Sequence, residues 1–378
     1  MGVTGLLTRV AANRPHVFLA EGANAFLTRS ALQRELRRRD WVEARSAADA
    51  DVLIVIGTLN APLSNLVNGL YEQMPGPRVR TPVLSAEDAP RALDQAQRLL
   101  LDIPRHVSDV ATRTGYAPPS SHEDTKGAMD HGAMDHGAMD HGAMDHGAMD
   151  HGAMDHGAMD HGAMDHGAMD HGAMAPAGIP LASGGQDRDG LEMDELNVRV
   201  GPLLPHWPAA LVAECVLHGD LVTEIHFEVL ADDSGMPAQA RAQTLRAAQL
   251  LDAVASTLVL AGSERFAQLA TSTCDAYLDG SPQADAQAQR LRSNVASSRV
   301  LRRVLGNIGD QRGDLHRFVT TVLDEAIGVL PSHSHMFNAS AVDLLKDWGT
   351  GRDISSLRLL AAALKADFVS EYIGAVRE

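Results

Sequence analysis

A tandem repeat in the middle of the chain holds most of the side chains that could bind a metal ion. The pentad Gly-Ala-Met-Asp-His runs nine times, from Gly127 to His171, and ends in Gly172-Ala173-Met174. Thioethers favour Cu(I), whereas imidazoles suit Cu(II), Ni(II) and Zn(II). We therefore expect weak binding of copper, nickel or zinc here. The candidate ligands are His131, His136, His141, His146, His151, His156, His161, His166, His171, Met129, Met134, Met139, Met144, Met149, Met154, Met159, Met164, Met169 and Met174.

The repeat is predicted to be a disordered linker, spanning 117–178 with its flanks. A period of five matches neither the 3.6 of a helix nor the 2 of a strand. A glycine in every unit costs a helix about 1 kcal/mol each time. The tract could equally be a bare tether or a product of replication slippage that the fold tolerates. Its histidines would also gain charge on mild acidification.

Outside the repeat, the residues suited to metal chemistry are few. His333, His335 and Met336 lie close together in PSHSHMF and form a weaker candidate metal site. The stretch Gly184–Gly190 resembles a calcium loop only in composition, and we expect a turn there. Two cysteines, Cys215 and Cys274, are too few for a cysteine-ligated cluster or zinc site. No intrinsic cofactor is therefore predicted.

The segment 1–116 reads as an α/β domain. Apolar runs at His16–Ala20 and Val52–Ile56 predict buried strands, and the second is typical of a parallel sheet. Helices are expected from a Ser30 cap onward, at 64–74 and at 91–101, with Glu35 and Arg39 as an outward-facing ion pair. Alternating strands and helices indicate an open, mostly parallel, flavodoxin-like sheet.

The segment 179–378 reads as an α+β domain. ELNVRVGPLLPHWPAALVAECVLHGDLVTEIHFEV predicts two strands, within about 195–230, around a turn at His218-Gly219-Asp220. From 238 to 378 the pattern is helical, with alanine-rich amphipathic runs that include 241–261, 285–305 and 354–375. A small antiparallel sheet followed by a mostly helical region is expected.

One stretch, Ala48–Arg78, carries several residues at spacings that are found together in a known family. A buried strand ends in Gly57-Thr58, a helix carries Tyr71-Glu72-Gln73-Met74, and Pro77-Arg78 follows. This resembles the small, cluster-carrying subunit of respiratory complex I and the small subunits of NiFe hydrogenases. That family holds its cluster with cysteines on the loop after the first strand, where this chain has Ala23, Asn24, Ala25 and Phe26. The resemblance implies a retained fold without a cluster.

A second stretch follows the linker and is similar to the opening of the large subunit of complex I, which helps to form the quinone cavity. The matching residues are Gly201, Pro202, Pro205, Leu211, Gly219 and Asp220. The two histidines of the family pattern are replaced by Leu204 and Pro208. The resemblance implies that the chain joins two polypeptides that are separate neighbours in those complexes.

Charge and hydropathy narrow the range of functions. The net charge is −17, but nine of the acidic residues are repeat aspartates, so nucleic-acid binding by charge is not expected. No apolar run reaches the roughly 18–20 residues that cross a bilayer, and no signal peptide is apparent. We expect a cytoplasmic protein without a direct membrane span, which reaches the membrane face only through partner subunits.

These observations predict a non-catalytic structural or assembly subunit of a membrane-bound, complex-I-like or hydrogenase-like oxidoreductase. Its partner subunits would supply the redox centres. One alternative is a metal-handling protein that acts on copper or nickel through the repeat. Another is an active NADH–quinone oxidoreductase-type subunit whose redox centre lies in partner chains.

Overall fold

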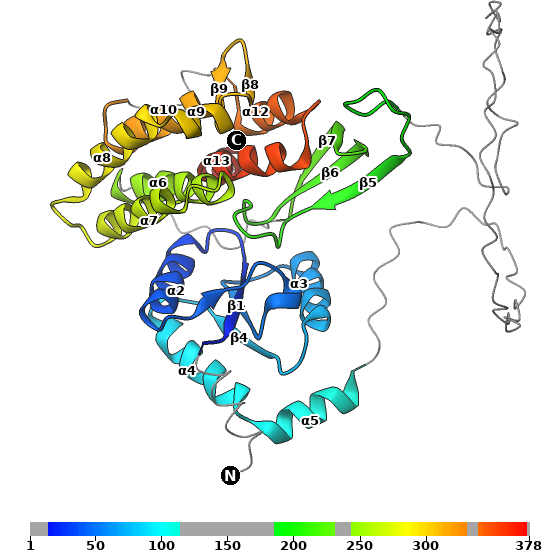
Figure 1. The fold of residues 1–378 in the computed structure, drawn as a ribbon. Helices are drawn as coiled ribbons and strands as arrows, with labels where there is room; N and C mark the ends of the chain where they lie inside the picture. The colour runs from blue at the N-terminus through cyan, green and yellow to red at the C-terminus, as the bar shows by residue number, and fades with distance from the viewer. Residues whose placement is uncertain (1–13, 114–184, 231–242, 331–338, 376–378) are drawn as a thin grey trace, which may run out of the picture. The chain divides into compact units, whose positions relative to one another are not determined.

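The computed structural model describes residues 14–113, 185–230, 243–330 and 339–375 (Figure 1). The repeat and the motif His333, His335 and Met336 lie outside these ranges, so the predictions made for them stay predictions. Residues 14–113 are called the N-terminal half below, and the described residues from 185 onward the C-terminal half. The two halves belong to one compact unit.

The N-terminal half is built on a four-stranded parallel sheet, as the sequence predicts. Its strand order is β2-β1-β3-β4, with β1 (His16–Glu21), β2 (Val42–Glu43), β3 (Val52–Ile56) and β4 (Val79–Val83). All five residues of β3 are buried, which explains their continuous apolar run. Helices α2 (Phe26–Arg38) and α4 (Ala89–Leu100) cover one face, and α3 (Ala61–Gln73) covers the other. Helix α5 (Ile103–Thr112) ends this half.

Helix α2 differs from the sequence prediction at its start. It begins at Phe26, one turn before Ser30, and Ser30 is buried inside it rather than capping it. Phe26 packs against the core of the C-terminal half, so a contact distant in sequence extends the helix. Glu35 and Arg39 do form the expected pair, at 2.7 Å, but both side chains are largely buried rather than outward-facing.

The C-terminal half opens with an antiparallel sheet of three strands, where the sequence predicted two. They are β5 (Glu195–Val200), β6 (Leu211–His218) and β7 (Leu221–Val229), in that order. The β6–β7 turn lies at Gly219 as expected, and Gly219 has the positive φ of +62° that such a tight turn requires. Of the stretch Gly184–Gly190, the described residues 185–190 contain the expected turn, in which the Asp187 carboxylate accepts hydrogen bonds from the amides of Asp189 and Leu191.

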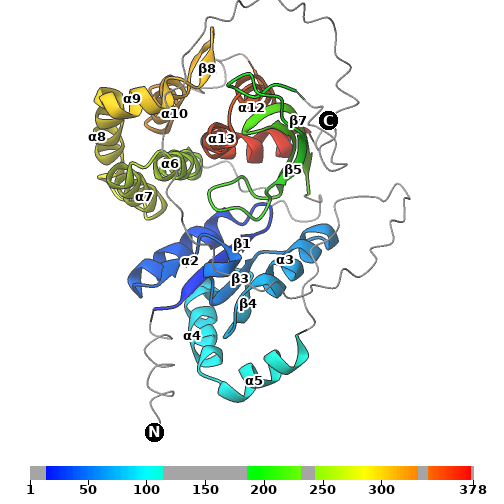
Figure 2. The same ribbon diagram turned by 45° about the vertical axis from the view of Figure 1, so that its right-hand side comes forward.

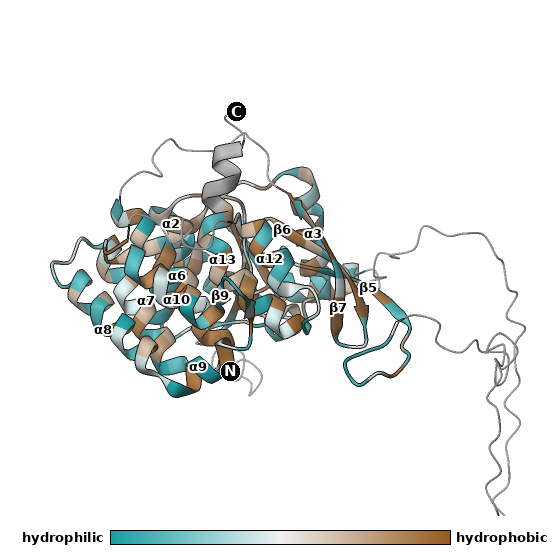
Figure 3. Cartoon of the chain, turned by 90° about the horizontal axis from the view of Figure 1, so that it is seen from above, coloured by the Kyte–Doolittle hydropathy of each residue, from teal (hydrophilic) through white to brown (hydrophobic). Residues whose placement is uncertain are grey.

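Helices make up the rest of this half. They are α6 (Gln243–Leu260), α7 (Glu264–Leu278), α8 (Ala284–Ser297), α9 (Arg299–Leu305), α10 (Leu315–Ala326), α12 (Ala341–Gly349) and α13 (Ile354–Ala375), with a short hairpin of β8 (Gly309–Asp310) and β9 (Gly313–Asp314) before α10. The helix expected at 285–305 is two helices, because Ser298 is extended and its hydroxyl caps α9 through the Leu301 amide. Helix α6 is central and mostly buried, whereas α8 carries mainly hydrophilic residues (Figure 3). None of the described helices is long and apolar enough to span a membrane.

Candidate functional site

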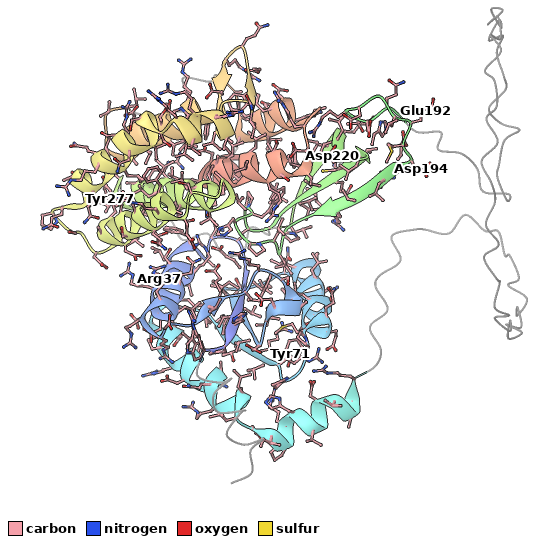
Figure 4. All side chains as sticks on the ribbon, viewed as in Figure 1. Arg37, Tyr71, Glu192, Asp194, Asp220 and Tyr277 are labelled. Atoms are coloured by element: carbon pink, nitrogen blue, oxygen red, sulfur yellow. The ribbon has the colours of Figure 1, made fainter. Side chains whose placement is uncertain are left out.

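Helix α2 of the N-terminal half lies against α6 and α7 of the C-terminal half (Figures 1 and 2). Arginines on α2 meet aspartates on the two other helices. Arg37, labelled in Figure 4, donates to Asp275 at 2.5 Å, and Arg34 contacts Asp279 at 2.6 Å. The basic run at the end of α2, Arg37–Arg39, therefore makes ion pairs within the molecule, although Arg37 and Arg38 remain exposed.

Arg29 is the centre of the contact between the halves. Its guanidinium lies 3.1 Å and 2.7 Å from the two carboxylate oxygens of Asp252 on α6. It also contacts Glu21, the last residue of β1, at 2.7 Å, and donates to Gln33 at 2.8 Å. Gln33 in turn donates to Glu43 of β2 at 2.9 Å. A two-pronged arginine–carboxylate contact of this kind fixes orientation as well as distance.

The hydrogen bonds continue into the C-terminal half. Lys365 of α13 lies 2.6 Å from Asp252 and donates to the Ser256 hydroxyl at 2.6 Å. Nδ1 of His206 is 3.4 Å from the same hydroxyl, at the long end of a hydrogen bond. The side chains from Glu43 to His206 thus form one chain across the two halves. We call it the interhalf network; its members are Glu21, Arg29, Gln33, Glu43, His206, Asp252, Ser256 and Lys365.

His206 sits in a strained loop between β5 and β6. Its φ is +66°, and Ala210 in the same loop has a φ of +63°. A non-glycine residue at positive φ persists only where the surrounding structure enforces it. Here the neighbouring Trp207 is buried and donates from its indole to the Leu211 carbonyl at 2.7 Å. That anchor holds the loop, and with it His206, beside α6.

The network borders a cavity of about 530 Å³ that both halves line. Its polar wall includes the side chains of the network. Its apolar wall includes Leu19, Leu36, Trp41, Leu204 and Val259. The volume falls in the range of small-molecule sites.

Burial and ion pairing set the charges of the network. Burial opposes ionisation of Asp252, but its pairing with Arg29 and Lys365 outweighs burial and lowers its pKa. Burial raises the pKa of Glu21 despite its contact with Arg29. Glu43 keeps some contact with solvent, but the protein packed around its carboxyl group displaces part of its water and raises its pKa too. The network therefore has one firmly ionised carboxylate and two that hold protons more strongly than usual.

His206 is neutral near pH 7. Burial lowers its pKa to about 4, and the positive charge of Lys365 adds to the effect. Burial also lowers the pKa of Lys365, although its contact with Asp252 favours the ammonium form. A neutral imidazole beside an ammonium group avoids placing two positive charges on one hydroxyl.

The cavity is lined by residues that precede the loop Ala23–Phe26 and by part of the second stretch that carries the family resemblance, whereas no residue of the first stretch, Ala48–Arg78, lines it. Leu19 and Glu21, just before the loop Ala23–Phe26, line it from the N-terminal half, and Pro202 and Leu204 line it from the C-terminal half. Leu203 packs into the core of the N-terminal half. Pro208 is buried and does not line the cavity.

The donors at the cavity do not fit an iron–sulfur cluster. A 4Fe–4S cluster takes four cysteine thiolates as ligands. The cavity is lined by one cysteine, Cys274. Burial raises the pKa of Cys274 to about 12, with nearby Asp252 adding to the effect, so the group remains a thiol. Burial raises the pKa of Cys215 to about 11. Both cysteines are free, buried thiols.

Sequence reasoning missed the central residues of this site. Arg29, Asp252 and Lys365 were not among the predicted site residues. A signal was present, because Asp252 and Lys365 each interrupt an otherwise apolar helical run, LLDAVAS and LLAAALKA. A lone charge on a buried helix face requires a partner. The sequence does not show which partner each one has.

Comparison of the chain with protein-family models, with curated proteins and with solved structures found no match.

Proposed function

We propose that this chain is a non-catalytic structural or assembly subunit of a membrane-bound oxidoreductase of the complex I or hydrogenase kind. It combines a small-subunit-like half with a large-subunit-like half, and its partner subunits carry the redox centres. The strand order β2-β1-β3-β4 is the order in which a flavodoxin-like sheet begins, as the resemblance implies for the first half.

One observation carries the proposal. Two residues just before the loop that would hold cluster cysteines, Leu19 and Glu21, and one of the two positions that would hold quinone-site histidines, Leu204, line one cavity on opposite sides of the contact between the halves. In the family these are separate subunits that sit side by side. Here ion pairs such as Arg29 with Asp252 occupy the contact, and the available thiol has a raised pKa. Ion pairs that hold the two halves of the chain together fit a structural role better than a role in electron transfer.

The repeat would then serve as a tether. A long flexible linker need only keep the second half at a high effective concentration near the first. The proposed location is the cytoplasmic face of the membrane, reached through partner subunits.

The proposal is tested by purifying the tagged chain from its native membranes and identifying the proteins that accompany it. An Asp252→Asn variant tests whether the contact between the halves is needed for assembly, because it removes the negative charge that pairs with Arg29. Asp220→Asn, on an exposed turn labelled in Figure 4, is the matched control. We expect partner subunits with the parent and the control, and fewer with Asp252→Asn. Equal recovery of partners with both variants would mean that the contact between the halves has no part in assembly.

A further inference from the structure

The cavity between the halves is suited to a ligand that is part charged and part apolar. Leu36, Trp41 and Val259 supply apolar surface on one wall, and the interhalf network supplies the polar wall. Most small-molecule sites combine a largely apolar lining with a few fixed polar groups. The cavity volume of about 530 Å³ would hold a molecule of roughly one ring and a short side arm.

The charges of the lining favour a cation. Five carboxylates line the cavity, against three arginine or lysine side chains. The carboxylates are Glu21, Glu43, Asp252, Glu264 and Asp275; the cations are Arg29, Arg37 and Lys365. Each of these cations already contacts a carboxylate at 2.5–2.7 Å. An anionic ligand would add to the negative excess, whereas one positive charge would offset part of it.

Glu43 is a carboxylate of the cavity lining that has capacity to accept further hydrogen bonds. In the described structure it accepts hydrogen bonds from the Gln33 amide, at 2.9 Å and 3.3 Å. An ionised carboxylate offers about four lone-pair sites. Desolvation raises its pKa, and no cationic side chain donates to it directly in the described structure. A ligand ammonium group could donate to the lone pairs of the Glu43 carboxylate that Gln33 leaves free.

An organic cation fits better than a bare metal ion. Within the described ranges, no group of three or more His, Cys, Asp or Glu side chains is arranged to hold a metal. Metal ions take several ligands at short distance, whereas an ammonium needs one carboxylate and a few acceptors. The apolar wall would add affinity for the body of an organic molecule.

We propose that this cavity is a binding site for a small organic cation, namely a protonated amine on an apolar body, with Glu43 as its ion-pairing partner. The proposal goes beyond a structural role for the chain and does not depend on that role.

The test uses the full-length protein and three probes of nearly equal size. Benzylamine is protonated near neutral pH, benzyl alcohol is neutral and benzoate is an anion. Binding is measured by titration calorimetry and by the rise in melting temperature. We expect saturable binding of benzylamine, weaker binding of benzyl alcohol and none of benzoate.

Two variants locate the site. Glu43→Gln keeps the shape of the side chain and should weaken benzylamine binding about tenfold, the effect of losing one partly buried ion pair. Glu192→Gln removes an exposed glutamate on the hairpin before β5, labelled in Figure 4, and should leave binding unchanged. The melting temperature of each free variant establishes that it is folded.

Several results would overturn the proposal: benzoate binding as well as benzylamine, equal benzylamine affinity in the parent and a folded Glu43→Gln variant, or no saturable binding of any probe. A tenfold loss with Glu43→Gln alone would support it.

Discussion

Arg29 and Asp252 are 223 residues apart in the sequence, yet their side chains meet through two hydrogen bonds, at 3.1 Å and 2.7 Å. This pair joins α2 of one half to α6 of the other. The side chains are only 11% and 16% exposed, so the charges have lost most of their water. Removing one partner of such a pair leaves the other buried and uncompensated.

The first prediction concerns this pair. Asp252→Asn should lower the free energy of unfolding by about 3 kcal/mol, because it leaves the buried Lys365 without its carboxylate and Arg29 with Glu21 alone. The change is measured by urea denaturation. The control Asp220→Asn breaks only an exposed contact with Arg188 and should cost about 0–1 kcal/mol. Equal costs for the two variants would show that the buried pair contributes no more than a surface one.

The second prediction concerns acid stability. The pKa of His206 is about 4 in the folded protein and about 6.5 in an unfolded chain. Between these values the unfolded chain binds more protons, so this group makes stability fall as the pH drops from about 6.5 to about 4. The charged groups acting on it are Lys365, Asp252, Arg29 and Arg358.

A His206→Asn variant isolates this effect. Its free energy of unfolding should depend less steeply on pH over the same range, as measured by urea denaturation at several pH values. Parallel pH profiles for the parent and the variant would mean that His206 takes up its proton as readily in the folded protein as in the unfolded chain.

The third prediction concerns Glu43, whose effect on stability depends on pH in the opposite direction to that of His206. Its pKa is raised in the folded protein. Its stabilising contribution to the free energy of unfolding is therefore present below the ordinary pKa of 4.5 and is lost as the pH rises through the pKa of the folded protein. Glu43→Gln should therefore match the parent in acid and be the more stable of the two at about pH 8. Thermal melts at both pH values check this. A variant that is less stable than the parent at the higher pH would refute it.

The fourth prediction concerns the cysteines. Burial raises the pKa of Cys215 to about 11 and that of Cys274 to about 12, so thiolate is scarce at neutral pH. Both thiols should react slowly with iodoacetamide in the folded protein and fully after unfolding in guanidinium. Rapid modification of either one in the folded state would reopen the question of a cysteine ligand.

The fifth prediction concerns the repeat. Deleting Gly127–Met174 should abolish weak binding of copper, nickel and zinc but leave the melting temperature unchanged, since the halves contact each other through the interhalf network. A length control replaces the nine repeat histidines by asparagine and keeps the tether. If copper or nickel sensitivity of the cell changes with both variants, metal handling becomes the better account. An unchanged phenotype with both favours a tether alone.

Much of the fold follows from local pattern. The apolar run Val52–Ile56 predicted a strand buried on both faces, and all five residues are buried. The turn at Gly219 and the helix at 354–375 were also predicted correctly. These features depend on periodicity and on backbone freedom, which a short window of sequence reveals.

The site itself could not be predicted in the same way. Ser30 has the residue type of a helix cap, but contacts made by Phe26 and Arg29 with the other half start the helix one turn earlier. The partners of Asp252 and Lys365 come from elements far apart in the sequence. A buried charge can be recognised from its apolar neighbours, but its partner is fixed only by tertiary packing.

The most direct test of the central claim is to purify the tagged chain anaerobically from its native membranes, identify its partners, and then assay the separated chain for iron–sulfur absorbance. The account predicts that cluster-bearing and membrane subunits of an oxidoreductase accompany the chain, and that the chain alone shows no such absorbance. An iron–sulfur spectrum on the isolated chain, or a chain recovered alone with copper or nickel bound, would contradict it.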